Sequence, residues 1–396
     1  MRGPSGSRRG WTIVAVLAVT ETISWGVLYY AFAVFLPSMQ RSLGWSKTEL
    51  TGAFSVALAT SALAAIPVGR WLDRHSPRPL MTVGSVAGAL LVLAWSQVHD
   101  LLVFYLVWAG IGLAMACVLY EAAFTVVTKW FRERRRRALT AVTLVGGCAS
   151  FIFSPLSNWL IAQQGWRDAL ITLAVILAAT TAPPHVLFLR RGPEPAEDGL
   201  PQVLVADAVA SDAFWYLTGA FVLSSFAISA IAVHLIPYLV EGGRSTAFAA
   251  FAAGLMGLMQ VPGRVVFAAA AHVLPRRYEA PSVFFLQAIG LAVLAATTAP
   301  AGVLAAVCLF GLANGMATLV RATAIADAYG PARYGSIAGV AAAFATAARA
   351  IAPVVAAGAY AAFSGYEPLL WLLAAGAVLA ALSARVAMAR LASVGS

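Results

Sequence analysis

Charged residues are scarce in this chain. Only 11% of its 396 residues are Asp, Glu, Lys or Arg, whereas a soluble globular protein contains about 25%. A surface with so few charges is poorly hydrated, so much of it must contact lipid. The scarcity argues against a soluble enzyme and favours a protein embedded in a membrane.

The chain also lacks the patterns on which common catalytic, metal and nucleotide sites depend. Its three cysteines, Cys117, Cys148 and Cys308, have neither metal nor disulfide spacing. No G-x-x-x-x-G-K-[ST], H-E-x-x-H or G-x-S-x-G motif occurs. We therefore expect no cofactor, no metal, no ATP-driven pumping and no enzymatic activity.

Long apolar stretches are abundant, and 61% of the residues are hydrophobic. A helix of about 20 apolar residues crosses a bilayer. Twelve stretches meet this length, and polar or Pro/Gly-rich breaks separate them. They are 11–36, 47–69, 80–97, 101–127, 138–161, 168–190, 212–239, 247–271, 281–299, 302–325, 335–362 and 368–389. This predicts an all-α membrane protein with twelve transmembrane helices, the first of which is too long for a signal peptide.

The basic residues indicate an orientation, because Lys and Arg concentrate in cytoplasmic segments. If the N-terminus is cytoplasmic, nineteen of the 26 Lys and Arg residues lie inside and four lie outside. The outside residues are Arg41, Lys47, Arg167 and Arg244. We therefore predict that both termini are cytoplasmic. The same bias explains the net charge of +10 without nucleic-acid binding.

An internal repeat connects the two halves of the chain at an offset near 200 residues. Pro155 corresponds to Pro353, and Met115-Ala116 corresponds to Met316-Ala317. The repeat predicts two pseudo-symmetric six-helix bundles, residues 1–190 and 212–396, joined by a cytoplasmic linker at 191–211. Such bundles enclose a site near the bilayer midplane and expose it alternately to each side.

The loop from Gly69 to Arg78 reads G-R-W-L-D-R-H-S-P-R. It resembles the G-x-L-x-D-R-x-x-R-[RK] signature of the major facilitator superfamily, whose members are membrane transporters. The resemblance implies that Gly69, Asp73, Arg74 and Arg78 form part of a conformational latch. A plain positively charged loop is the alternative. The resemblance also implies a bacterial inner membrane location and a monomer.

Two further stretches are similar to the monocarboxylate porter and oxalate/formate antiporter branch. They are Lys129-Trp130-Phe131 with the following basic and glycine residues, and Gly263-Arg264 in the eighth span. By resemblance, Arg264 matches a carboxylate-binding arginine and Arg349 a second cation. Gln260 stands where proton-coupled members have an acid, and Tyr30 stands where they have a lysine. The usual residue set for proton coupling is therefore incomplete, and uniport and exchange both remain open.

Charges inside the membrane need a partner or a cavity. Arg264 and Arg349 both lie near mid-depth, where the two planar guanidinium groups could hold the carboxylate of a substrate. Each could instead pair with a fixed acid or with carbonyl oxygens. Glu21 could pair with an arginine, carry a proton, or form a structural hydrogen bond. His234 could carry a proton or serve as a structural histidine.

Further polar and aromatic residues complete the candidate site. Glu121 and Arg321 occupy nearly equivalent repeat positions and could form a gating ion pair, although Arg321 could also pair with Asp327. Asn314 and Gln260 are polar residues that could contact the substrate. Candidate cavity-lining aromatics, which helix packing could equally explain, are Trp25, Tyr29, Tyr30 and Tyr120.

These observations together predict a carrier for small organic anions, monocarboxylates in particular, that works by alternating access. A drug or metabolite exporter with structural arginines is one alternative. A membrane receptor or sensor that does not transport is another. The expected partners are a small-molecule substrate and the lipid bilayer.

Overall fold

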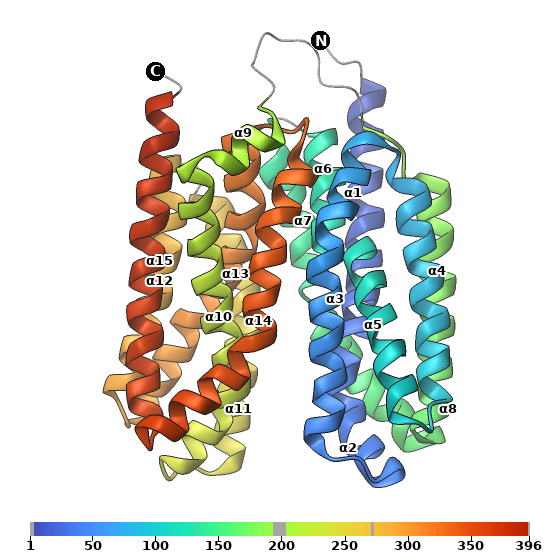
Figure 1. The fold of residues 1–396 in the computed structure, drawn as a ribbon, viewed down its shortest axis with the longest axis vertical. Helices are drawn as coiled ribbons and strands as arrows, with labels where there is room; N and C mark the ends of the chain where they lie inside the picture. The colour runs from blue at the N-terminus through green and yellow to red at the C-terminus, as the bar shows by residue number, and fades with distance from the viewer. Residues whose placement is uncertain (1–3, 132, 193–202, 271–272, 395–396) are drawn as a thin grey trace. The chain divides into compact units, whose positions relative to one another are not determined.

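The computed structural model describes residues 4–131, 133–192, 203–270 and 273–394. Within these ranges every regular element is a helix (Figure 1). Eleven helical segments of the described residues are long and apolar enough to cross a membrane. The chain is therefore a multi-pass α-helical membrane protein.

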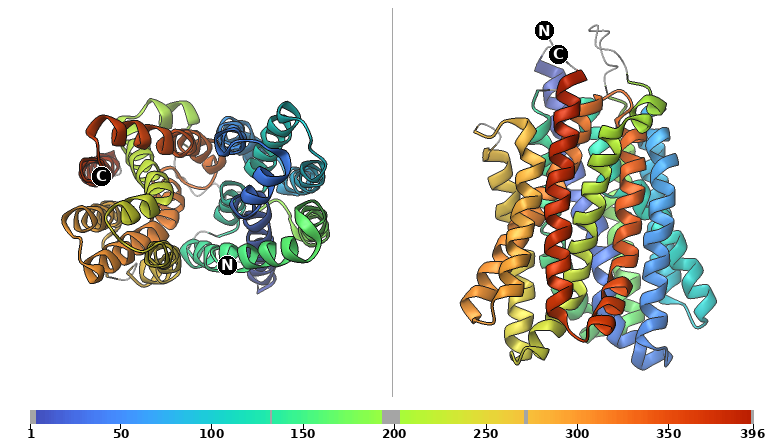
Figure 2. Two further views of the ribbon diagram at one scale, coloured as in Figure 1. Left: turned by 90° about the horizontal axis from the view of Figure 1, so that it is seen from below. Right: turned by 60° about the vertical axis from the view of Figure 1, so that its left-hand side comes forward.

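The helices group into two compact units. The first contains Met1–Gln202 and Tyr329–Ala343, and the second contains Val203–Ala328 and Phe344–Ser396. Seen along their axes, the helices of each unit stand side by side (Figure 2). The division into six-helix bundles at 1–190 and 212–396 stays a prediction. Part of the predicted linker lies outside the described residues, and another part, Val205–Ala210, forms the short helix α9.

The first unit is built from ten segments. They are α1 (Pro4–Trp25), η1 (Gly26–Tyr30), α2 (Ala31–Leu43), α3 (Lys47–Arg74), α4 (Pro77–Ser96), α5 (Leu101–Val118), α6 (Tyr120–Trp130), α7 (Arg135–Gly146), α8 (Ala149–Phe188) and the first turns of α14 (Tyr334–Phe363).

The second unit contains α9, the rest of α14 and five further helices. These are α10 (Asp212–Glu241), α11 (Thr246–Ala270), α12 (Arg276–Ala296), α13 (Pro300–Tyr329) and α15 (Tyr366–Val394).

Local sequence signals explain several helix ends. Ser46 and Glu49 form a capping box at the start of α3, in which each side chain accepts the backbone N–H of the other residue. Asp100 caps α5 by accepting the N–H of Val103. Gly165 has a φ of 80° and divides α8, so the two predicted spans at 138–161 and 168–190 are separate as expected.

Three helix irregularities in the first unit were not predicted. The first predicted span contains the π-helical turn η1. The fourth is interrupted at Leu119, whose φ and ψ of −88° and −175° are extended. The fifth is interrupted at Gly147 and Cys148, between α7 and α8. Irregular backbone within membrane helices is tolerated where protein buries it or where it faces a cavity.

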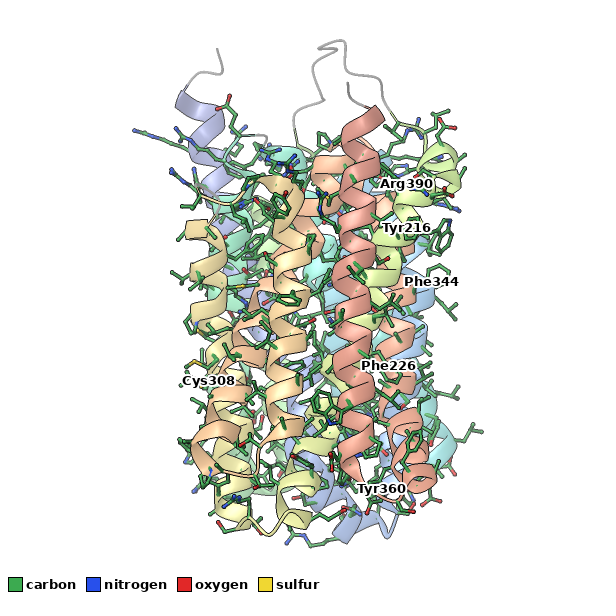
Figure 3. The ribbon with its side chains drawn as sticks, turned by 90° about the vertical axis from the view of Figure 1, so that its left-hand side faces the viewer. Tyr216, Phe226, Cys308, Phe344, Tyr360 and Arg390 are labelled. Carbon is green, nitrogen blue, oxygen red and sulfur yellow. The ribbon has the colours of Figure 1, made fainter. Side chains whose placement is uncertain are left out.

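Large apolar side chains project outward from both units. Leu63 is 74% exposed and Leu106 64% exposed, which fits a lipid-facing surface. In Figure 3, Tyr216 and Phe344 lie on the outer face of the second unit. Near one end of α15, Arg390 lies over the Tyr216 ring at 5.1 Å and pairs with Asp212 of α10, which joins these two helices.

Candidate functional site

A partly open cavity lies in the second unit, and its empty space of about 300 Å³ includes space that is open to the surroundings. Four helices line it, and two of its lining residues carry guanidinium groups. The lining residues are Phe221, Ser224, Ser225 and Ile228 of α10, Phe284 of α12, Asn314, Ala317, Thr318 and Arg321 of α13, and Arg349 of α14. Three sequence-predicted residues, Asn314, Arg321 and Arg349, are thus brought together.

The spacing of the lining residues shows why the cavity forms where it does. On α10 and on α13 they recur at positions i, i+3, i+4 and i+7, so each helix presents one continuous face to the cavity. The Ser and Thr residues of these faces are common in membrane helices, where they often bond within their own helix. Ser224, Ser225 and Thr318 therefore carry no distinctive sequence signal, and a search for buried charges does not find them.

The backbone that carries Arg349 is held by a side chain from another helix. Pro353 has no N–H, so the carbonyl group of Arg349 loses its usual partner four residues on. Ser229 of α10 replaces that donor, with its Oγ 2.8 Å from the Arg349 carbonyl oxygen. This hydrogen bond fixes the position of Arg349 relative to the cavity-lining face of α10.

His234 also stabilises this part of α14. Its Nε2 lies 3.0 Å from the Pro353 carbonyl oxygen, and its Nδ1 lies 3.3 Å from the Tyr366 hydroxyl. Because a carbonyl only accepts, Nε2 is the donor to Pro353, and Nδ1 lies within hydrogen-bond distance of the Tyr366 hydroxyl. Both ring nitrogens therefore have a partner. The role of His234, as a proton carrier or as a structural histidine, stays a prediction.

A buried amide lies behind the cavity. Gln287 of α12 is fully buried, and its Oε1 accepts a 2.8 Å hydrogen bond from the cavity-lining Ser224. Its Nε2 has no hydrogen-bond partner among the described residues. A buried amide left half-satisfied is costly, so this group orients Ser224 and retains a donor that a polar ligand or a water molecule can use.

Arg264 and Gln260 do not line this cavity. Arg264 is only 4% exposed on α11, at a point of very close helix packing. A Cβ at the neighbouring Gly263 would lie 2.2 Å from the Leu312 carbonyl oxygen of α13. A Cβ at Gly315 would lie 2.1 Å from the Gln260 carbonyl oxygen. The structure therefore associates Arg349 with Arg321, and the substrate-binding roles of Arg264 and Gln260 stay predictions.

A second set of predicted residues converges in the first unit, around η1. Glu21 of α1 is fully buried, and its Oε2 accepts a 3.0 Å hydrogen bond from Trp25 Nε1. Its Oε1 makes no hydrogen bond with the residues that the structure describes. A buried carboxyl group in this setting is a candidate for proton binding.

The aromatic residues predicted to line a cavity form one cluster with Trp25. The Trp25 ring lies 5.1 Å from Tyr29, 6.1 Å from Tyr30 and 5.0 Å from Tyr120. The breaks in the helices create this cluster. The π turn places Tyr29 and Tyr30, while the interruption at Leu119 makes Tyr120 the first residue of α6. Tyr120 also stacks on Phe124.

The residues predicted as a latch contact the start of α14 within the first unit. Asp73 Oδ1 accepts the N–H of Gly335 at 3.0 Å, and Oδ2 accepts that of Ser336 at 2.6 Å. Lys129 Nζ pairs with the same carboxylate at 3.3 Å. The first N–H groups of a helix have no partner within it, and they attract negative charge. Asp73 therefore caps α14.

Close backbone contact accompanies this cap. A Cβ at Gly69 would lie 2.0 Å from the Gly335 carbonyl oxygen, and one at Gly339 would lie 2.5 Å from the Ala65 carbonyl oxygen. Gly69 is thus required by packing. Gly335 and Lys129 lie outside the 69–78 loop, so the loop signature does not predict their part in this contact.

The remaining latch and gate residues have other surroundings. Arg78 donates from Nε to the Leu189 carbonyl oxygen at 3.1 Å, and Arg74 is exposed. Glu121 belongs to the first unit and Arg321 to the second, so their predicted ion pair stays a prediction. Among the described residues no group of three or more potential metal-ligating side chains occurs.

Comparison with known proteins gives a consistent result. Residues 15–353 match the Major Facilitator Superfamily. Monocarboxylate transporter 13 of Bos taurus is 24% identical over 330 residues, which cover 81% of this chain and 76% of that protein. Monocarboxylate transporter 3 of Rattus norvegicus is 26% identical over 400 residues, which cover 96% of this chain and 79% of that protein.

The fold is also similar to that of solved transporter structures. The crystal structure of the human organic anion transporter MFSD10 superimposes with a TM-score of 0.77 at 16% identity, covering 97% of this chain and 100% of that one. The family match over residues 15–353 covers most of the chain, and it agrees with the helical fold and with the 69–78 signature. This chain belongs to the Major Facilitator Superfamily of membrane transporters.

Proposed function

We propose that this transporter carries small organic anions, monocarboxylates in particular, by alternating access. The observation that supports this most is the cavity of the second unit, where Arg321 and Arg349 lie together with Asn314, Ser225 and Thr318. A guanidinium group offers two parallel N–H donors to a carboxylate, and the amide and hydroxyl groups supply further hydrogen bonds. The similarity to monocarboxylate transporters supports the same substrate class.

In this proposal Arg349 is the principal carboxylate ligand. Ser229 holds its backbone where Pro353 cannot donate a hydrogen bond, so its side chain is presented to the cavity from a fixed position. Arg321 provides the second positive charge. Phe221, Phe284 and Ile228 provide an apolar wall for the hydrocarbon part of a small acid.

Asp73 is proposed to act as the latch, holding α14 by its first N–H groups in one state and releasing them in another. The contacts with Gly335, Ser336 and Lys129 support this role. Glu21 is proposed as the coupling group, supported by its complete burial beside Trp25. We also propose cytoplasmic termini, a bacterial inner membrane location and a monomeric protein.

The test is uptake of labelled lactate, pyruvate, oxalate and formate into proteoliposomes. We expect saturable uptake that falls at least about tenfold in Arg349→Gln, because a charged hydrogen bond contributes about 1.5–3 kcal/mol. Arg277→Gln is the matched control, since Arg277 is exposed and lies over the Tyr278 ring outside the cavity.

Two further results decide between alternatives. If Arg264→Gln abolishes uptake and Arg349→Gln does not, the substrate binds at the arginine expected from family resemblance rather than in this cavity. If no carboxylate is transported or competes, the anion proposal is wrong, and transport of amphipathic or cationic compounds becomes the function to test.

A further inference from the structure

Two side chains, one from α10 and one from α12, form a buried polar pair at the wall of the second unit's cavity. Ser224 lines the cavity and is buried. Its Oγ donates a hydrogen bond of 2.8 Å to Oε1 of Gln287, which is fully buried. An amide oxygen only accepts, so the single hydroxyl proton of Ser224 is used inside the protein. The Ser224 oxygen can then offer only its lone pairs to a molecule in the cavity.

An aromatic pair one turn earlier supports the register of this contact. Phe221 and Phe284 lie three residues before Ser224 and Gln287 in α10 and α12, and their rings meet edge to face with centroids 6.1 Å apart. Residues three apart lie on the same side of a helix. The polar pair and the aromatic pair therefore belong to one packed seam between the two helices, which holds Gln287 beside Ser224.

A second hydroxyl group of the cavity wall has the same polarity. Thr318 Oγ1 donates to the Asn314 carbonyl oxygen of its own helix at 3.4 Å. The guanidinium groups of Arg321 and Arg349, which line the same cavity, can only donate. The wall thus combines cationic donors, which suit a carboxylate, with two hydroxyl oxygens that suit a donor group on the same molecule.

We propose that this cavity selects small hydroxy acids over keto acids of the same carbon skeleton. Ser224 accepts the hydroxyl hydrogen bond of the substrate, and Gln287 is the positioning residue that orients Ser224. This inference rests on the proposed transport of small organic anions. A keto oxygen can only accept, so it would meet the lone pairs of Ser224 without forming a bond. A site built to bond a substrate hydroxyl rejects an analogue that leaves the site unpaired.

The KM values for uptake of labelled lactate, pyruvate and propionate into proteoliposomes test this preference. The three acids have three carbons each and are ionised at neutral pH, so they differ only at the second carbon. We expect the KM for lactate to be at least about fivefold lower than the KM for pyruvate or propionate. This factor corresponds to one hydrogen bond of about 1 kcal/mol.

Two variants identify the groups responsible. Ser224→Ala removes the acceptor, and Gln287→Leu frees the Ser224 proton so that it can be donated to a keto oxygen. In both variants the ratio of the pyruvate KM to the lactate KM should fall to between about one and two. A merely structural role of either residue would change uptake of both acids together and leave this ratio unchanged.

Ser383→Ala is the matched control. Its hydroxyl group also donates from one helix to another, because Ser383 of α15 bonds the Tyr216 carbonyl oxygen of α10 at 2.7 Å. Ser383 does not line the cavity. We therefore expect the wild-type KM ratio in this variant.

Two results would overturn this inference and leave the proposed function in place. One is a wild-type protein that takes up pyruvate or propionate with a KM as low as that for lactate, which would mean that Ser224 donates to the ligand. The other is a preference for lactate that survives in Ser224→Ala. If none of the three acids is transported, the anion function itself is wrong, and this inference falls with it.

Discussion

At the scale of single residues, Asp73 carries more interactions than its place in a basic loop suggests. One carboxylate satisfies two backbone N–H groups at the start of α14 and the ammonium of Lys129. Its side chain is only 7% exposed, so water cannot replace these partners easily. Removing the charge therefore disturbs the cap and the ion pair together.

We predict that Asp73→Asn lowers the free energy of unfolding by about 1–3 kcal/mol, the contribution typical of hydrogen bonds to a charged group. It should also reduce uptake. Thermal unfolding in detergent and proteoliposome uptake measure the two effects. Asp100→Asn is the control, because asparagine caps a helix as well as aspartate does. A wild-type melting temperature for Asp73→Asn would contradict the assigned cap.

Ser229 is the second residue with a role that only its surroundings reveal. We predict that Ser229→Ala raises the KM for a carboxylate about three- to tenfold, because the loss of a hydrogen bond of about 1 kcal/mol frees the backbone at Arg349. Ser229→Thr keeps the hydroxyl and should remain near wild type. Ser282→Ala, which removes only a bond within α12, is the control. An unchanged KM in Ser229→Ala would show that this bond does not position Arg349.

At the scale of helices, the π turn after α1 and the break at Leu119 between α5 and α6 determine where the aromatic cluster forms. Gly26 opens the π turn, and a Cβ there would lie 2.2 Å from two ring carbons of Phe153 on α8. Atoms cannot approach so closely, so an alanine at this position must displace α8 or straighten the turn. The glycine is needed for this contact rather than for an unusual φ.

We predict that Gly26→Ala strongly reduces both folded yield and uptake. In a Phe153→Ala background the same change should cost much less, since the two ring carbons at 2.2 Å are gone and only the Cβ of residue 153, at 2.8 Å, remains close. This double-mutant cycle isolates the contact with the ring. Gly254→Ala, where no atom lies within 4 Å of the added Cβ, should be neutral or stabilise by up to about 1 kcal/mol. Similar losses from Gly26→Ala in both backgrounds would refute the packing explanation.

These helices also show what the sequence could predict. Apolar length and polar breaks located the membrane helices, and the break near Gly165 followed from them. The interruption at Leu119 has neither glycine nor proline beside it, so tertiary packing rather than local preference determines it. The cost of a buried charge drew attention to Arg349 and Arg321, and both line one cavity in the structure. Their shared cavity could not be predicted, since depth along a helix does not specify which face a residue occupies. The predicted roles of Arg349 in substrate binding and of Arg321 in a gate stay predictions.

At the scale of the whole molecule, transport requires that loading of a driving ion be linked to movement of the substrate. The site residues are divided between the units: Glu21 and the aromatic cluster belong to the first, and the two cavity arginines belong to the second. Gln260 stands at the position where proton-coupled carriers of the similar branch are expected to have an acid. Glu21, which is fully buried in the first unit, is therefore the coupling group that we propose.

We predict that Glu21→Gln abolishes proton coupling but leaves exchange of the substrate intact. The neutral amide resembles a permanently protonated carboxyl group, so exchange of labelled for unlabelled carboxylate should continue, whereas accumulation driven by a pH gradient should be lost. Counterflow and gradient-driven uptake in the same proteoliposomes measure the two. Glu49→Gln, at the exposed start of α3, serves as the control and should retain both.

If Glu21→Gln still accumulates substrate, Glu21 is a structural partner of Trp25, and the driving ion binds elsewhere. Loss of both activities would instead place Glu21 in the substrate pathway itself.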